Sequence, residues 1–258
     1  MLNRLETIIK EAGKKLAVFH KEADKGVRHK GSVDLVTKYD LLIEKELTIA
    51  LNKAFPDYTV IGEEGADSSI HKQGKVIYLD PIDGTTNFVH KLPFCAISCG
   101  MYEDGEPICA CVDAPLLRET YSAEKGRGAF LNGERISVSK TVNPVEALVC
   151  TGFPYDRSKV SKIIPVLEHL LSFSRDIRRT GSASIDLCYT ARGVFDVYYE
   201  LDLKPWDMAA GILIVKEAGG EVTDLREQMH DLSTRLVVAT NGRLHKTYLQ
   251  EIKKVYEE

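Results

Sequence analysis

The spacing of apolar residues in the first part of the chain predicts two helices followed by short strands. Leucine, isoleucine and alanine recur every three or four residues from Leu2 onward, the period of an amphipathic helix, and predict a helix over residues 2–24. Thr37 suits an N-cap, and the apolar positions after it predict a second helix that ends near Phe55. The strands predicted next are residues 60–61, 76–79 and a hairpin of residues 96–102 and 108–112.

The second part of the chain alternates strands and helices more regularly. Pro165 lies inside one predicted helix and is expected to kink it or to break it in two. Gly193 and the pair Gly219-Gly220 are stop signals for two others. The predicted strands are residues 147–151, 176–179, 195–200, 221–224 and 236–239, and the predicted helices are residues 159–173, 182–192, 206–218 and 244 to the end.

These elements predict an α/β (α+β) protein with a mostly antiparallel first sheet and a second sheet layered by helices. The chain has 258 residues and shows no internal repeat and no Pro/Ser-rich linker, which fits a single domain over residues 1–258. Within it, subdomains of about residues 1–140 and 141–258 are expected to meet near residues 137–146.

The charge and the cysteines narrow the range of partners. A net charge of -4 argues against a basic nucleic-acid-binding surface and against a polybasic membrane anchor, so any anionic ligand has to be met locally. The chain lacks an apolar run of the roughly 18 residues that a membrane span needs, and its charged N-terminal segment does not fit a signal peptide. Six cysteines without a C-x-x-C pair predict reduced thiols in a cytoplasmic protein.

The segment with the most suggestive chemistry is Asp80-Pro-Ile-Asp83-Gly-Thr-Thr-Asn-Phe88. A short apolar strand delivers Asp80 to its end, and Asp83-Gly84 favours a tight turn. The amides that follow the turn would face one spot and could bind an anion. Carboxylates beside a phosphate repel it unless divalent cations lie between, and Mg²⁺ prefers carboxylate and phosphate oxygens. An ordinary surface turn is the alternative interpretation of this spacing.

Two further segments place carboxylates next to apolar elements. Glu63 and Glu64 follow the strand that begins at Val60, and Asp207 falls in the first turn of an apolar helix. Taken singly, the first fits a solvated acidic turn and the second fits stabilisation by the helix dipole.

Together the three segments resemble the inositol monophosphatase family of lithium-sensitive, magnesium-dependent sugar-phosphate phosphatases. Asp80 to Phe88 resembles the first family signature, Trp206-Asp207-x-Ala-Ala-Gly the second, and Gly62-Glu63-Glu64 the metal-ligand segment. The supporting matches, in order between about residues 33 and 220, are Asp34-Leu-Val-Thr-x-x-Asp40, Gly181-Ser-Ala183, Tyr198-Tyr-Glu200 and Glu217-Ala-Gly-Gly220.

The resemblance implies a layered α-β-α-β-α sandwich and a two-metal site. The first Mg²⁺ would be held by Glu63, Asp80 and the backbone carbonyl of Ile82, and the second by Asp80, Asp83 and Asp207. A weaker third ion would lie near Asp40. The catalytic residues would be Glu63 and Thr85, which orient the attacking water. The residues implied to bind the substrate are Asp83, Gly84, Thr85, Thr86, Ser182, Ala183, Glu200 and Asp207.

The implied activity is Mg²⁺-dependent hydrolysis of inositol-1-phosphate, or of a related polyol or sugar phosphate, by a metal-activated water. The family also implies a homodimer and inhibition by lithium. Fructose-1,6-bisphosphate, NADP and histidinol-phosphate remain open as substrates, as does a non-catalytic sugar-phosphate sensor. An aspartyl-phosphate phosphatase is the nearest rival by chemistry, but it needs Asp-x-Asp-x-Thr, whereas two residues separate Asp80 from Asp83 here.

Some residues depart from the family pattern. Ser184 stands where the family often has alanine, and its hydroxyl is expected to be structural. Arg178 and Arg179 point to opposite faces if they lie on a strand, so at most one faces the site. Each fits a surface or interface salt bridge, or a clamp for a second phosphate. The loop from Lys25 to Lys30 could serve the same purpose.

Overall fold

The computed structural model describes residues 1–31, 34–65, 74–154, 156–227, 232, 234 and 236–256. The helices are α1 (Leu2–Phe19), α2 (Lys38–Ala54), α3 (Thr85–Val89), α4 (Val160–Leu171), α5 (Ala183–Ala191), α6 (Pro205–Glu217) and α7 (His245–Tyr256), with short 3-10 turns η1 (Pro144–Glu146) and η2 (Arg157–Lys159). The strands are β1 (Arg28–His29), β2 (Leu35–Val36), β3 (Thr59–Gly62), β4 (Lys75–Asp83), β5 (Ala96–Glu103), β6 (Glu106–Ala114), β7 (Glu119–Glu124), β8 (Gly128–Leu131), β9 (Glu134–Ile136), β10 (Leu148–Thr151), β11 (Asp176–Arg178), β12 (Val197–Leu201), β13 (Glu221–Thr223) and β14 (Leu236–Thr240).

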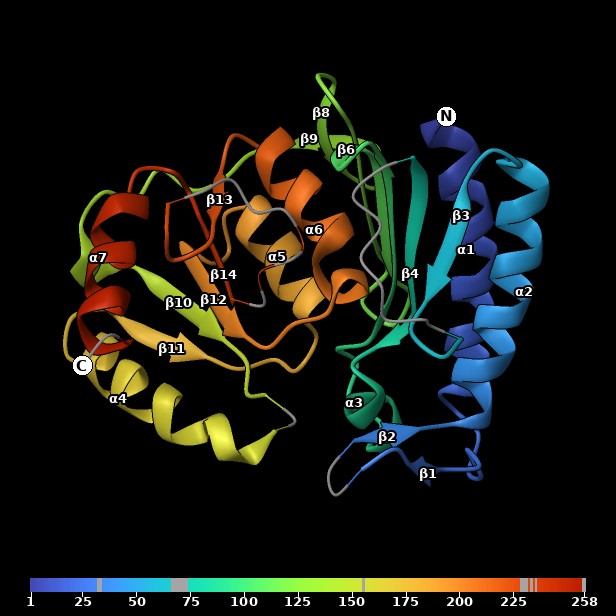
Figure 1. Cartoon of the computed structure of the whole chain (residues 1–258), viewed down its shortest axis with the longest axis horizontal. Helices are drawn as coiled ribbons and strands as arrows, with labels where there is room; N and C mark the ends of the chain where they lie inside the picture. Colours follow the sequence, from blue (N-terminus) through green and yellow to red (C-terminus); the bar gives the residue numbers. More distant parts are fainter. Residues whose placement is uncertain are drawn as a thin grey trace.

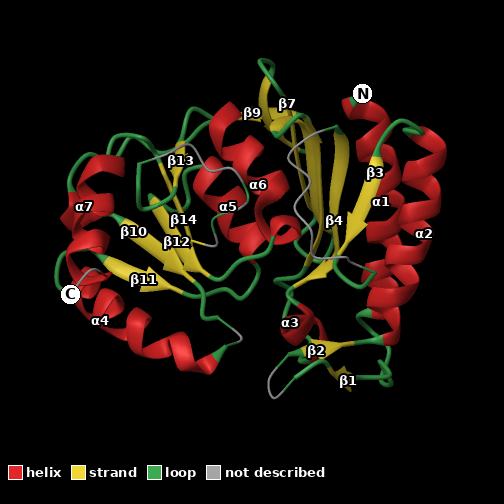
Figure 2. Ribbon diagram, in the orientation of Figure 1, coloured by secondary structure: helices red, strands yellow, loops and turns green. Residues whose placement is uncertain are grey.

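The seven-stranded and the five-stranded sheet alternate with layers of helices, and β1 pairs with β2 in a separate two-stranded sheet (Figures 1 and 2). The first sheet has the order β3-β4-β5-β6-β7-β8-β9 and is antiparallel except for the parallel pair β3-β4. The second has the order β11-β10-β12-β14-β13, with β10 parallel to both of its neighbours. Helices α1 and α2 cover the outer face of the first sheet, α5 and α6 lie between the sheets, and α4 and α7 cover the second. The predicted α-β-α-β-α sandwich is therefore confirmed.

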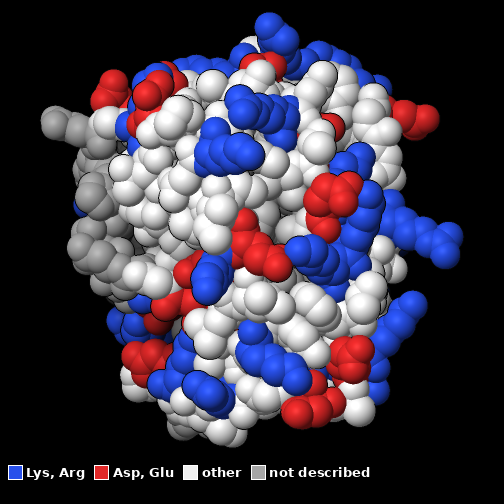
Figure 3. Space-filling model, turned by 90° about the vertical axis from the view of Figure 1, so that its right-hand side faces the viewer, with Lys and Arg blue, Asp and Glu red and all other residues white. Residues whose placement is uncertain are grey.

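The outer layer of α1 and α2 is charged on its exposed side. Figure 3 shows this side of the molecule, with positive and negative side chains interspersed over it. Lys15 of α1 pairs with Glu46 of α2 at 2.6 Å between Nζ and Oε2. The inner side buries leucine and isoleucine against the first sheet. This separation of polar and apolar faces is the amphipathic pattern that the sequence predicts for both helices.

Helix α6 is the structural link between the two sheets. It is buried almost all round, as expected of an apolar helix with a sheet on each side. Two side chains of β5 bond to its backbone: Ser98 Oγ donates to the carbonyl of Trp206 at 3.3 Å, and the Tyr102 hydroxyl donates to that of Ala209 at 3.0 Å. The start of α6, which carries Asp207, is thereby fixed against the first sheet. In the described part of the chain, no helix is long and apolar enough to cross a membrane.

Several predicted boundaries differ from the structure. Helix α1 ends at Phe19 and not at residue 24, because Lys25 Nζ donates to the carbonyls of His20 (3.0 Å) and Glu22 (2.8 Å) and closes a turn there. Helix α4 is not broken, since it continues through Pro165. The predicted 96–112 hairpin forms as β5 and β6, and both strands are buried between helical layers, so it belongs to the core. The last two residues of the predicted final helix, 257 and 258, lie outside the described residues.

We expect Gly100→Ala to destabilise the protein, because β5 and α6 touch at this glycine. An added Cβ would lie 2.8 Å from the backbone of Ala209 and Ala210. Backbone atoms cannot move aside cheaply, so the free energy of unfolding should fall by about 1–3 kcal/mol in urea denaturation. Gly31→Ala is the control, because no atom of the described residues lies within 4 Å of a Cβ there. Equal stability of Gly100→Ala and the wild type would show that this contact is looser than the structure indicates.

Candidate active site

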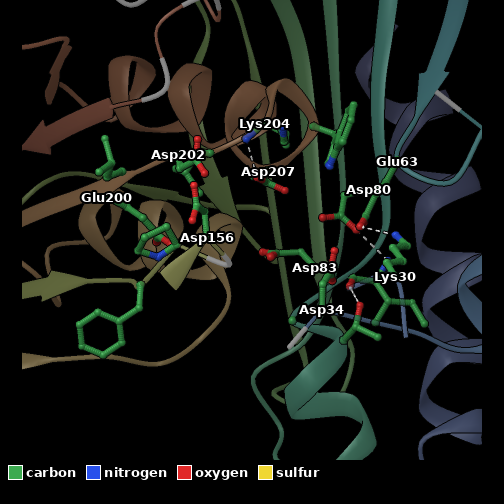
Figure 4. Close-up of a pocket in the computed structure, with 18 residues that line it drawn as sticks. Lys30, Asp34, Glu63, Asp80, Asp83, Asp156, Glu200, Asp202, Lys204 and Asp207 are labelled. Atoms are coloured by element: carbon green, nitrogen blue, oxygen red, sulfur yellow. Dashed lines mark hydrogen bonds and ion pairs between the residues drawn. The ribbon is translucent and has the colours of Figure 1, made fainter. Parts of the chain in front are cut away.

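Elements from both sheets surround one cavity of about 410 Å³ (Figure 4). Glu63 follows β3, Asp80 and Asp83 lie in β4, and Asp207 is at the start of α6. Figure 4 shows Glu63, Asp80 and Asp83 on one side of the cavity, Glu200 and Asp202 on the other, and Asp207 between them. The residues that line it are Lys30, Asp34, Glu63, Asp80, Ile82, Asp83, Gly84, Thr85, Phe153, Pro154, Asp156, Glu200, Leu201, Asp202, Leu203, Lys204, Trp206 and Asp207.

An irregular strand end shapes the first wall of the cavity. The register of β4 against β5 shifts between Asp80 and Asp83, so both carboxylates reach the same space. Asp80 Oδ1 accepts from the backbone N–H of Ile82 at 2.9 Å. Gly84 then adopts φ +91°, and a Cβ on it would lie 2.7 Å from the Phe94 carbonyl oxygen. Glycine is required here by both conformation and space.

Thr85 connects this turn to the N-terminal helices. Its hydroxyl lies 3.0 Å from the Ile82 carbonyl and 3.1 Å from Asp40 Oδ1. Asp40 is fully buried and accepts from the backbone N–H of Thr37 at 2.8 Å, which forms the N-terminal capping box of α2. Burial raises the pKa of Asp40 to about 6, although hydrogen bonds from Thr37 oppose the shift. Asp40 therefore lies beneath Thr85, behind the cavity wall.

Donors from the second half of the chain hold Asp83 and Asp207 in place. Asp83 Oδ2 accepts from the hydroxyls of Ser182 (2.6 Å) and Ser184 (2.5 Å) and from the Ser184 N–H (2.7 Å). Asp207 Oδ2 accepts from the backbone N–H of Lys204 at 2.7 Å and so caps α6. These bonds fix the orientation of both side chains before any ligand binds.

The cavity concentrates negative charge in a poorly solvated place. Asp80 and Asp83 are 2% and 7% exposed. Burial, followed by the nearby charges of Glu63, Asp83 and Asp207, raises the pKa of Asp80. The pKa values of Glu63, Asp83 and Asp207 are also raised, mainly by burial. These carboxylates thus lack enough positive charge around them, which is the condition that a divalent cation relieves.

Lys30 brings a positive charge to the cluster. Lys30 Nζ lies 2.9 Å from Glu63 Oε1 and 2.5 Å from Glu64 Oε1. Although burial opposes it, the attraction of these carboxylates raises the pKa of Lys30, so it stays charged. Among the described residues, no three His, Cys, Asp or Glu side chains converge tightly enough to chelate an ion as they stand. The oxygen donors suit Mg²⁺, and its binding at Glu63 would replace Lys30 there.

The structure brings most of the predicted site residues together. Among the described residues, Thr86, Ser182 and Ala183 are the predicted substrate contacts that do not line the cavity. Thr86 is exposed, whereas Ser182 is 2% exposed and its hydroxyl donates to Asp83 Oδ2. Ser184, expected to be merely structural, contacts the same carboxylate. The cavity residues that sequence reasoning did not place there are Asp34, Phe153, Pro154, Asp156, Leu201, Asp202, Leu203 and Lys204.

The two arginines differ in their surroundings. Arg178 pairs with Asp176 at 2.6 Å on the surface. Arg179 lies over the ring of Phe153, 5.7 Å from its centroid, and its charge lowers the pKa of Glu200 against the larger effect of burial. Arg179 is therefore the one next to the cavity wall. Lys25 is 4% exposed and bonded to backbone carbonyls, so it is not available to a phosphate.

The chain matches the family model for the inositol monophosphatase family over residues 2–257. It is 38% identical to the chloroplastic phosphatase IMPL1 of Arabidopsis thaliana over 90% of this chain and 65% of that longer protein. It is 38% identical to an inositol-1-monophosphatase of Rhizobium meliloti, covering 98% of this chain and 96% of the relative. A fructose-1,6-bisphosphatase/inositol-1-monophosphatase of Thermotoga maritima is 36% identical, with 97% and 95% covered.

A solved structure has the same fold. The extragenic suppressor protein suhB from Bartonella henselae superposes with a TM-score of 0.91 at 32% identity, over 98% of both chains. The fold and the acidic cavity define a phosphoric monoester hydrolase. The chain belongs to the inositol monophosphatase family.

We expect Asp80→Asn to stabilise the metal-free protein and to abolish stabilisation by Mg²⁺. Because the carboxyl pKa values are raised on folding, the native state binds protons that the unfolded chain has released above about pH 4. The stability of the metal-free protein should thus fall as the pH rises above about 4, up to about pH 6 for Asp40. Removing one charge should raise the unfolding free energy at about pH 8 by about 1–3 kcal/mol.

Thermal denaturation with and without Mg²⁺ measures both effects. Asp57→Asn, at an exposed position outside the cavity, is the matched control and should behave like the wild type. A metal-free Asp80→Asn protein that melts below the wild type would mean that this carboxylate is not under electrostatic strain.

Proposed function

We propose that this protein hydrolyses the phosphate monoester of inositol, or of a related polyol or sugar, with Mg²⁺ as cofactor. The observation that carries the proposal is the convergence of Glu63, Asp80, Asp83 and Asp207 on one cavity, with raised pKa values that a divalent cation would relieve. The cavity, at about 410 Å³, is large enough for a phosphorylated sugar or polyol.

The family resemblance implies the metal ligands, and their oxygen donors suit Mg²⁺. Glu63, Asp80 and the Ile82 carbonyl would hold one ion, and Asp80, Asp83 and Asp207 a second, with a weaker third near Asp40. When bound, such ions polarise the phosphate and lower the pKa of a coordinated water. The chain contributes orientation: serine hydroxyls fix Asp83, and the Lys204 N–H fixes Asp207.

The residues of the β4–α3 turn would bind the phosphate and position the water. Gly84 lines the cavity, and its φ of +91° is one that glycine adopts without strain, so its backbone can face a phosphate there. Thr85 would orient the attacking water together with Glu63. The contacts of Thr85 with Asp40 and Ile82 hold its hydroxyl at the cavity wall and fix its rotamer.

Glu200 would bind hydroxyl groups at the other end of the substrate. Its carboxylate accepts from the Tyr198 hydroxyl at 2.6 Å. It also packs so close to Gly152 that a Cβ there would lie 2.0 Å from Oε1. Burial raises the pKa of Glu200 to about 7, so both protonation states are present near neutral pH. A carboxyl group in this state can donate to or accept from a substrate hydroxyl.

Fructose-1,6-bisphosphate is the second candidate substrate. Its support is Arg179, which lies at the cavity wall over Phe153 and could meet a second phosphate. A non-catalytic sugar-phosphate sensor is less well supported, because Glu63 and Thr85 both line the cavity in positions that chemistry would use. NADP and histidinol-phosphate remain further candidates.

A panel of phosphate monoesters tests the proposal directly. Phosphate release from inositol-1-phosphate, fructose-1,6-bisphosphate, NADP and histidinol-phosphate would be measured with Mg²⁺, with and without lithium. We expect the highest kcat/KM for inositol-1-phosphate and inhibition by lithium at about tens of millimolar, because a weakly held cation can exchange. Absence of phosphate release from every ester would contradict the proposed function.

The site variants Glu63→Gln and Asp207→Asn make the assignment specific. Each removes one metal-binding charge at nearly constant size, so kcat/KM should fall by about 10²-fold or more. Glu134→Gln, on exposed β9, is the charge-matched control. Undiminished phosphate release by the two site variants would show that the cavity is not the active site.

We also propose that the protein is a homodimer, as the family resemblance implies. Since β5 and β6 are buried within the subunit, the interface would use other surfaces. Sedimentation equilibrium should give about twice the 28.8 kDa chain mass, and a monomer mass at micromolar concentration would refute this.

A further inference from the structure

Asn87 occupies the seam where the β4–α3 turn meets the loop between β11 and α5. It lies in α3, and its side chain is 5% exposed. Its amide nitrogen Nδ2 donates to the carbonyl oxygen of Phe94 at 2.7 Å and to that of Thr180 at 2.9 Å. Both donor hydrogens are therefore used, and one of the bonds crosses to the second half of the chain.

The same two segments enclose Gly84. A Cβ on Gly84 would lie 2.7 Å from the Phe94 carbonyl oxygen and 3.2 Å from that of Gly181. The neighbouring Gly181 is equally confined, because its own Cβ would lie 2.9 Å from Asn87 Nδ2. The position of Gly84 thus depends on how tightly Asn87 draws these two carbonyl-bearing segments together.

The segment that Asn87 holds also supplies the donors to Asp83. Ser182 and Ser184 lie two and four positions after Thr180, and both donate to Asp83 Oδ2. A shift of the Thr180–Gly181 backbone would move these donors relative to β4. The carboxamide of Asn87, which lies outside the cavity lining, is therefore bonded to the segment beside the glycine turn and to the segment that leads to the serine donors of Asp83.

We propose that Asn87 is a positioning residue, whose carboxamide clamps the Asp83–Gly84 turn to the Thr180–Ser184 loop and sets the affinity of the cavity for phosphate and Mg²⁺. This inference rests on the proposed function for the identity of the ligands. The geometry of the clamp comes from the bonds of Asn87 itself.

Asn87→Asp removes the clamp at constant size. An aspartate offers only acceptors, so it loses both bonds and repels the carbonyls of Phe94 and Thr180. We expect the Kd of inorganic phosphate, measured by titration calorimetry in the presence of Mg²⁺, to rise about tenfold. Asn87→Ser keeps one donor and should give a smaller rise of about threefold, and it decides the question if Asn87→Asp does not fold.

The matched control is Asn241→Asp. Asn241 is also buried, at 3% exposure, and its Nδ2 bonds two oxygens, Ser139 Oγ and the Thr141 carbonyl, both at 2.9 Å. It follows Thr240, which pairs with Val197 at the end of β12 away from Glu200. Asn241→Asp should lower the Tm by a similar amount but leave the phosphate Kd within about twofold of the wild type.

A lower Tm with an unchanged phosphate Kd in the Asn87 variants would overturn the proposal, since Asn87 would then stabilise the fold alone. Calorimetry does not require turnover. A wild-type protein that binds phosphate but cleaves none of the esters would therefore contradict the proposed function and leave the clamp supported by the Kd values of the variants.

Discussion

The constraint on which this structure depends is the cost of keeping four carboxylates in one weakly solvated cavity. A buried charge is tolerated only if donors or counter-ions meet it. Each of these carboxylates has such a partner. The partners are the Ile82 N–H for Asp80, two serines for Asp83, the Lys204 N–H for Asp207 and Lys30 for Glu63. The strand bulge, the start of α6 and the loop before α5 are therefore placed by the same electrostatic requirement.

Helix α6 allows both halves of the chain to meet that requirement. Because it is apolar on all sides, it can pack on both sheets at once, and the side chains of β5 fix its first turns. Asp207 is carried by this helix, whereas Asp80 and Asp83 are carried by the sheet that it contacts. The distance from Asp207 to Asp80 and Asp83 is then set by the rigid packing of a helix on a sheet, which is less adjustable than a loop.

Local features of this protein could be predicted from its sequence, and contacts between distant segments could not. The Thr37 cap, the 96–112 hairpin and the glycine after Asp83 are each decided by neighbouring residues, and the structure has them. The family resemblance supplied the four proposed metal-ligating carboxylates, Glu63, Asp80, Asp83 and Asp207, and the structure places them around one cavity. The shared role of Ser182 and Ser184 as donors to Asp83 was not predictable, because Asp83 lies about a hundred positions earlier in the chain. The end of α1 likewise depends on a side chain that folds back onto it.

The separation in sequence between Asp83 and its serine partners has a consequence for synthesis on the ribosome. These donors are 99 and 101 residues from Asp83, and Asp207 comes later still. A nascent chain that ends after the seven-stranded sheet carries Asp80 and Asp83 beside an apolar sheet face that α5 and α6 cover in the complete protein. This apolar face of the first sheet is therefore exposed until α5 and α6 have been synthesised. The acidic cavity therefore cannot be complete before residue 207 of the 258 has been made.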